Sequence, residues 1–217
     1  QAFIARRDAA VAAIINSLSR RVKRELSDEQ NELLATVGTI KGNLSAIALL
    51  PTPETQLERY EDLALPALAD AAAAGASLAP LKGRGSSHTS VGDLASELAS
   101  AIVGPLRDRL ERAVGESAGD RDDLTKRIRS TFREWKGQRV DGTVENAVLA
   151  ACNRGLLDRL PRSGKVRWVV AEGDAPSPDC EDNSLAGAVA CGSPFPTGHN
   201  APPLHPGCHC AVLPADS

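Results

Sequence analysis

Apolar residues recur at steps of three or four positions over the first 160 residues, and this spacing is typical of amphipathic helices. Ser27 and Gln30 are arranged like a capping box, which predicts that a first helix ends near residue 26 and that a second begins there. Pro66 and Pro105 fall inside later apolar stripes and are expected to kink or interrupt those helices. The predicted helices cover residues 2–26, 27–50, 54–74, 91–114, 122–138 and 143–160.

The pattern changes after Gly164. The segment Lys165–Ala171 (KVRWVVA) is rich in β-branched residues and predicts a strand, and Cys210–Leu213 (CAVL) predicts a second strand that pairs with it. Between them prolines and glycines are so frequent that neither a regular helix nor a long strand is expected. An ordered fold in this part of the chain therefore needs a staple such as a metal ion.

These patterns predict a mainly α protein with a helical N-terminal region and a small, loop-rich α+β domain that is stapled by zinc at the C-terminus. The predicted organisation is a helical region over 1–81, a flexible linker over 82–90, a helical region over 91–138 and a Cys/His-rich domain over 139–217. Aromatic residues make up only 3% of the chain. The helices are therefore expected to need partners, in this chain or in another subunit, for full burial.

Composition and charge narrow the classes of partner. No apolar run approaches the roughly 18–20 residues of a membrane span, so no membrane contact is expected. Ten basic and seven acidic residues lie between Leu106 and Arg139, whereas the segment from Ala171 to the C-terminus has six acidic residues and no Lys or Arg. This asymmetry is too weak to predict nucleic-acid binding by itself. Because the chain begins with Gln1, it is expected to be a piece of a longer product.

Four of the five cysteines follow residue 179, which favours a metal site in a reducing compartment over a secreted disulfide framework. The segment His205–Cys210 (HPGCHC) carries several thiol and imidazole groups on a Pro/Gly turn. Zinc prefers a tetrahedral set of such ligands, and Cys180 is the natural donor from outside the turn. The predicted structural zinc is held by Cys180, His205, Cys208 and Cys210.

The sequence leaves other arrangements open. Cys191, His199 or His209 could replace one of the four ligands, although His209 is expected to point away from the cysteines that flank it. A metal-free fold could instead contain a disulfide. The pairings considered are Cys180 with Cys191, and either of these with Cys208 or Cys210.

Several catalytic signatures are missing. The chain has neither the His-x-Glu and Pro-Cys-x-x-Cys pattern of zinc deaminases nor the His-Glu-x-x-His of metalloproteases. It also lacks a phosphate-binding loop and a dinucleotide fingerprint. Cys152 lies on an apolar helix face and is interpreted as a core cysteine rather than a nucleophile. We therefore expect no enzymatic activity and no small-molecule substrate.

Between Arg139 and Pro214 the chain resembles the C-terminal module of phage Mu F-type minor head proteins. The residues that carry the resemblance are Trp168-Val-Val, Cys180, Gly192-Ser-Pro-Phe195-Pro196 and Pro203-Leu-His205-Pro-Gly-Cys208-His209-Cys210, with a looser match at Gln138, Arg139, Thr143, Glu145, Asn153 and Gly155. The family has a cysteine where this chain has Ser177, and an arginine where it has His209.

The resemblance implies a minor capsid, or head morphogenesis, protein of a phage or phage-like particle. Such a protein is made in the bacterial cytoplasm and lies in the virion, in the capsid interior or at the portal vertex. The implied partners are the portal and the major capsid protein in an oligomeric assembly, and contact with packaged DNA is compatible with that position. The alternative is a prophage-derived cytoplasmic protein-interaction module with a structural zinc.

Overall fold

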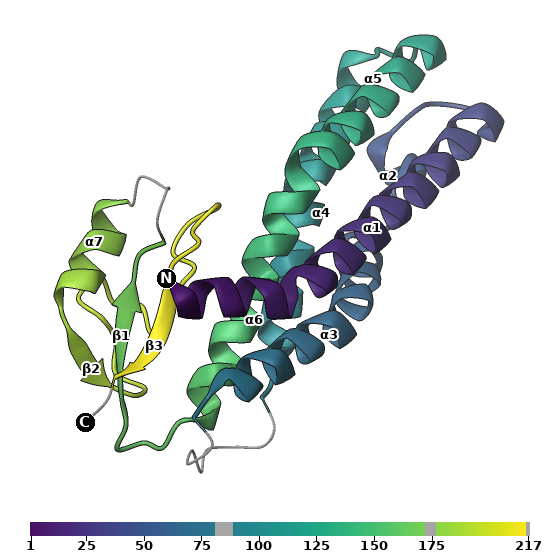
Figure 1. Ribbon diagram of the computed structural model, residues 1–217. Coiled ribbons are helices and arrows are strands. Elements are labelled where there is room, and N and C mark those ends of the chain that lie inside the picture. The colour runs from purple at the N-terminus through teal and green to yellow at the C-terminus, as the bar shows by residue number, and fades with distance from the viewer. Residues whose placement is uncertain (81–88, 172–176, 216–217) are drawn as a thin grey trace.

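The computed structural model describes residues 1–80, 89–171 and 177–215 (Figure 1). It is mainly helical with a small three-stranded antiparallel sheet near the C-terminus, which confirms the predicted fold class. The helices are α1 (Ala2–Thr39), α2 (Ala46–Leu49), α3 (Pro53–Leu78), α4 (Gly92–Glu116), α5 (Arg121–Glu134), the π-helix η1 (Trp135–Arg139), α6 (Val140–Arg159) and α7 (Pro178–Leu185). The strands are β1 (Lys165–Val169), β2 (Ala188–Ala190) and β3 (Ala211–Ala215).

Helix α1 is one continuous element, so the prediction of two helices that meet near residue 26 is wrong. Ser27 does not cap a helix, because its Oγ donates to the backbone oxygen of Lys23 at 2.9 Å within α1. Leu26, Leu33 and Val37 are buried and carry the apolar stripe past the expected break. Packing of this stripe against α3, α5 and α6 outweighs the local capping signal.

Pro66 and Pro105 lie inside α3 and α4, and neither proline interrupts its helix. A proline removes one backbone hydrogen bond and crowds the preceding turn. Leu68 after Pro66 and Leu106 after Pro105 are fully buried. The apolar face of each helix is therefore packed on both sides of its proline, and this packing offsets the local cost.

Helices α3 and α6 share the largest helix–helix interface of the fold. Their backbones touch at two glycines. A Cβ atom added to Gly75 would lie 1.8 Å from the carbonyl oxygen of Cys152, and one added to Gly155 would lie 1.9 Å from that of Ala72. The two helices can approach this closely only because neither glycine carries a side chain.

Buried side chains form two apolar clusters. The larger cluster, here called the helical core, runs from Val11 to Cys152 and joins α1 to α6. The smaller cluster, the C-terminal core, begins at Leu156 in α6 and ends at Val212 in β3. Helix α6 contributes to both cores and so connects the helices to the C-terminal part of the chain.

The predicted organisation compares with this arrangement as follows. The predicted boundary between residues 138 and 139 falls inside the continuous helical stretch of η1 and α6. The predicted linker over 82–90 lies outside the described residues, except for Thr89 and Ser90. Within the described ranges no helix is both long enough and apolar enough to cross a membrane.

The C-terminal sheet has the strand order β2-β1-β3, with both pairings antiparallel. The predicted pairing of the two strands is confirmed, and Trp168 in β1 lies opposite Val212 in β3. The Trp168 ring packs edge-on against Phe195, with ring centroids 5.2 Å apart. This aromatic pair forms the centre of the C-terminal core.

One prediction for the Pro/Gly-rich stretch is wrong, because α7 is a regular helix of eight residues within it. Pro178 occupies the first turn of α7, where its fixed φ suits the helix and its missing N–H has no partner to lose. Ser177 caps the same turn through its side chain. A proline that would break a helix interior thus helps to begin this one.

Candidate metal centre

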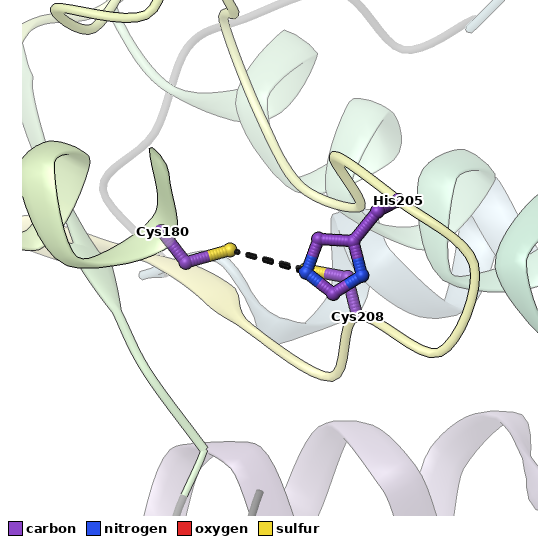
Figure 2. A group of neighbouring side chains, drawn as sticks. All are labelled: Cys180, His205 and Cys208. Carbon is purple, nitrogen blue, oxygen red and sulfur yellow. Dashed lines mark hydrogen bonds between the residues drawn. The ribbon is translucent and has the colours of Figure 1, made fainter. Parts of the chain in front are cut away.

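Cys180 lies in the first turn of α7. The Oγ of Ser177 accepts a hydrogen bond from the backbone N of Cys180 at 3.3 Å, which fixes the start of the helix. The Cys180 side chain is completely buried. It faces the loop that precedes β3 rather than solvent (Figure 2).

His205 and Cys208 are the first and last residues of a tight turn. Pro206 has a fixed negative φ, Gly207 has a φ of +77°, and the backbone N of Cys208 donates to the oxygen of His205 at 3.1 Å. This is the pattern of a type II turn, which favours proline and then glycine at its centre. The Oδ1 of Asn146 in α6 accepts from the backbone N of Gly207 at 3.2 Å and anchors the turn to the helical region.

The three side chains converge on one point (Figure 2). The Sγ of Cys180 lies 3.6 Å from Nε2 of His205 and 3.7 Å from Sγ of Cys208. All three ligand atoms lie within 4.8 Å of one another. Tetrahedral zinc, with Zn–S about 2.3 Å and Zn–N about 2.0–2.1 Å, holds its ligand atoms about 3.5–3.8 Å apart. Both separations from Cys180 match an edge of that tetrahedron.

The His205 ring has the tautomer that a metal ligand needs. Its Nδ1 lies 3.0 Å from the backbone oxygen of Pro206. A carbonyl oxygen only accepts hydrogen bonds, so Nδ1 carries the proton and donates. The lone pair is then on Nε2, the atom that faces Cys180. Metal-binding histidines are typically oriented by such a bond from the other ring nitrogen.

Cys210 lies beside this group of three but is not a member of it. It is buried in the C-terminal core together with Cys180 and Cys208. The chain enters β3 at Ala211, and in extended backbone residues two apart face the same side. Cys208 and Cys210 therefore share one side of the chain. The intervening His209 turns toward Glu145 in α6, with 3.8 Å between Nδ1 and Oε1.

The thiols of this cluster differ in acidity. Donation from the Cys210 thiol and from backbone N–H groups lowers the pKa of Cys208 to about 5. The same contact with Cys208, together with burial, raises the pKa of Cys210. Burial is the main cause of the raised pKa of Cys180. Burial thus disfavours the thiolate forms of Cys180 and Cys210, and a bound cation would favour them.

The other candidate ligands lie elsewhere. The Sγ of Cys191 contacts the backbone oxygen of Leu157 at 3.8 Å, and Nδ1 of His199 lies 3.1 Å from Oγ1 of Thr197. Both Cys191 and His199 line a cavity of about 990 Å³ that α4 and α6 form with the C-terminal loops. None of the three clustered residues lines this cavity. All five cysteines are free thiols, so none of the considered disulfides is present.

Cys152 and Ser117 are of residue types that can act as nucleophiles, and both are buried. Cys152 lies in the helical core, where burial raises its pKa to about 11. The segment Gly115-Glu-Ser-Ala-Gly119 matches the Gly-x-Ser-x-Gly pattern of hydrolases. Ser117 nevertheless follows a helix rather than a strand, is 3% exposed and donates its hydroxyl to the oxygen of Val114. The geometry of a nucleophile elbow is absent at this serine.

Arg7 is one of the charged residues on the flanks of the predicted first helix, but its side chain is completely buried. Its guanidinium donates to the backbone oxygens of Cys210 at 2.5 Å and His209 at 2.9 Å, and it pairs with Asp8 at 2.7 Å. Arg7 therefore ties the start of α1 to the loop that carries the cysteines, and Figure 1 shows this end of α1 beside β3. The sequence contains one signal for this burial, which is that Arg7 lies four positions before Val11 and therefore on the same face of the helix.

We expect Arg7→Met to lower the free energy of unfolding by about 2–4 kcal/mol, because two buried carbonyl groups lose their donor. Urea unfolding followed by circular dichroism measures the change. Arg6→Met is the matched control, since Arg6 is the exposed neighbour on the same helix and its loss should change stability by less than about 0.5 kcal/mol. Equal effects of the two substitutions would show that the Arg7 bonds do not stabilise the fold.

Comparisons with known proteins give no relatives for this chain. No protein-family model, no curated protein and no solved structure matches it.

Proposed function

We propose that this protein is a structural, non-enzymatic protein whose C-terminal part is stapled by one zinc ion. The ligands are Cys180, His205, Cys208 and Cys210. The observation that carries this proposal is the spacing of 3.6 and 3.7 Å between Cys180 and its two partners, which is the spacing around a tetrahedral ion. Four protein ligands close the coordination sphere, which is the arrangement of structural rather than catalytic zinc.

The chemistry of the four donors supports zinc among the possible metals. Three thiolates and one imidazole suit zinc, whereas magnesium and calcium prefer oxygen ligands. Cys210 is the candidate for the fourth position because it is buried in the same core as Cys180 and Cys208 and follows Cys208 by two residues. The thiols of Cys180, Cys208 and Cys210 are buried, and the nearby Arg7 guanidinium binds backbone oxygens of the loop, so a dication at the cluster would supply positive charge directly at the thiolates.

We further propose that the chain acts in head morphogenesis as a minor capsid protein in the virion, at the portal or the inner capsid surface. The sequence resemblance over Arg139–Pro214 supports this function. The elongated set of helices offers a long surface to the portal or the major capsid protein (Figure 1). Lys126, Arg129 and Arg133 recur at helical spacing on exposed positions of α5 and pair with no described carboxylate, which suits contact with packaged DNA.

The zinc proposal is tested by elemental analysis of the purified full chain. We expect about one equivalent of zinc in the wild type and a loss of most of it in Cys208→Ser. Cys191→Ser is the control, because Cys191 is a half-buried cysteine of the same region that lies outside the cluster. A wild type without zinc, or an equal loss in both variants, would contradict the proposed site.

The head-assembly proposal is tested by the genes that flank this one and by reconstitution with their products. We expect adjacent portal and major capsid genes, and incorporation of this chain into particles when all three proteins are expressed together. A gene with no capsid genes nearby, whose product stays outside such particles, would favour the cytoplasmic interaction module instead.

A further inference from the structure

Trp168 lies in the central strand of the C-terminal sheet and is 1% exposed. Its indole Nε1 is buried and has no hydrogen-bond partner within the part of the chain that the structure describes. A buried N–H group without an acceptor is costly, and buried tryptophans usually find one. The indole N–H of Trp168 is therefore a buried donor for which the described residues supply no acceptor in hydrogen-bond geometry.

Cys210 lies on the same face of the β1–β3 pair as Trp168, because Trp168 is opposite Val212 and Cys210 precedes Val212 by two residues. Both side chains belong to the C-terminal core. A neutral thiol is a weak acceptor, whereas a thiolate is a strong one. The unpartnered donor and the candidate fourth ligand thus lie on one face of the sheet, and a metal-bound thiolate at Cys210 would be a strong acceptor for this donor.

We propose that the indole N–H of Trp168 donates a hydrogen bond to the metal-bound thiolate of Cys210 and positions this thiolate as the fourth ligand. The inference rests on the proposed zinc site and adds to it a residue that does not itself touch the metal. The pairing of β1 with β3 fixes Trp168 against Cys210, because Trp168 lies opposite Val212, two residues beyond that cysteine. Phe195 packs edge-on against the Trp168 ring and helps to hold it in place.

This role explains two features of the site. Cys210 stands apart from the group of three ligand atoms, so it needs a contact that directs its sulfur toward them. A hydrogen bond to a thiolate also spreads its negative charge, which matters where three thiolates surround one dication. Ser177 positions Cys180 in a different way, because its Oγ accepts a hydrogen bond from the backbone N of Cys180.

The test compares Trp168→Phe with Trp135→Phe in the full chain. Trp135 is the matched control because it is also buried with an unpartnered Nε1, but it lies in the helical core. Phenylalanine keeps an aromatic ring at either position and removes only the donor and part of the volume. We expect Trp168→Phe to weaken zinc binding about 10- to 100-fold in a chelator competition, and Trp135→Phe to leave it unchanged.

Cobalt as a spectroscopic substitute for zinc gives a second measurement. Without the hydrogen bond the thiolate is richer in electrons, so the thiolate-to-cobalt charge-transfer band of Trp168→Phe should shift to lower energy. Zinc affinity and this band both unchanged in Trp168→Phe would overturn the inference while leaving the zinc site intact. A wild type that binds no metal would instead contradict the proposed function.

A measurement on the wild type covers the case in which Trp168→Phe fails to fold. In protein labelled with ¹⁵N-tryptophan, the indole N–H of Trp168 should move downfield and exchange more slowly with solvent when zinc is added. The Trp135 signal serves as the internal reference and should stay in place. If the Trp168 signal moves no more than the Trp135 signal, the proposed hydrogen bond does not form.

Discussion

Removing zinc with a chelator is expected to unfold the C-terminal part of the chain, residues 177–215, while helices α1 to α6 stay folded. The three clustered ligands and Cys210 all lie in this segment, and Cys180, Cys208 and Cys210 are themselves members of the C-terminal core. The helical core contains none of these four residues. Metal loss should therefore unfold the C-terminal part under conditions in which the helical core stays folded.

The size of this expected effect of zinc removal follows from the small size of the C-terminal core. Ordering each residue costs about 1–2 kcal/mol of conformational entropy, and this segment contributes few bulky apolar side chains to offset that cost. Outside the cysteines, the fully buried large side chains near the site are chiefly Trp168, Phe195 and Val212. A structural zinc contributes about 10–16 kcal/mol in small zinc-binding peptides, which is enough to decide whether such a segment folds.

Trp168 fluorescence measures this effect in a Trp135→Phe background, where Trp168 is the only tryptophan. We expect the chelator to shift the emission to longer wavelength, because the buried ring loses its contact with Phe195 and meets water. Far-ultraviolet circular dichroism should keep most of its helical signal, and added zinc should restore the fluorescence. Emission that stays unchanged at a chelator concentration that removes all zinc would show that the C-terminal core folds without metal.

Three of the proposed metal ligands, His205, Cys208 and Cys210, could be proposed from sequence because their information is local, whereas Cys180 reaches them from α7 through the fold. The Pro206-Gly207 pair encodes a type II turn, and this turn alone brings His205 and Cys208 to one side of the chain. The pairing of the two predicted strands then places Cys210 next to Trp168. The spacing of residues along the sequence does not determine the distance from Cys210 to the other ligands, because this distance depends on the packing of β3 against the cluster.

Two errors of the sequence analysis, at Ser27 and at Arg7, share a physical cause, which is that long-range contacts outweighed local signals. The capping pattern at Ser27 gave way to the burial of Leu26 and Leu33 along one uninterrupted helix. Arg7 looks like a solvated charge until the loop at Cys210, 203 positions away, supplies carbonyl groups for it. In contrast, α7 was missed although its signal is local, because a serine cap followed by proline predicts the start of a helix.

Gly155→Ala is expected to destabilise the protein by about 3 kcal/mol or more, a large effect for one added methyl group. The new Cβ would lie 1.9 Å from the carbonyl oxygen of Ala72 and 2.8 Å from its Cα. These are backbone atoms of α3, so no side-chain rotation can relieve the overlap. The two helices must move apart, and Gly75 opposite Cys152 would lose its close contact as well.

Gly142→Ala is the control within the same helix, because a Cβ there meets no atom within 4 Å. Alanine has a higher helix propensity than glycine, so this variant should gain up to about 1 kcal/mol of stability. Thermal and urea unfolding of the two variants should thus change in opposite directions. Because α6 joins the helical core to the C-terminal core and Asn146 in α6 holds the turn at Gly207, Gly155→Ala should also weaken zinc binding. A Gly155→Ala variant as stable as Gly142→Ala would show that α3 and α6 do not pack as closely as this structure has them.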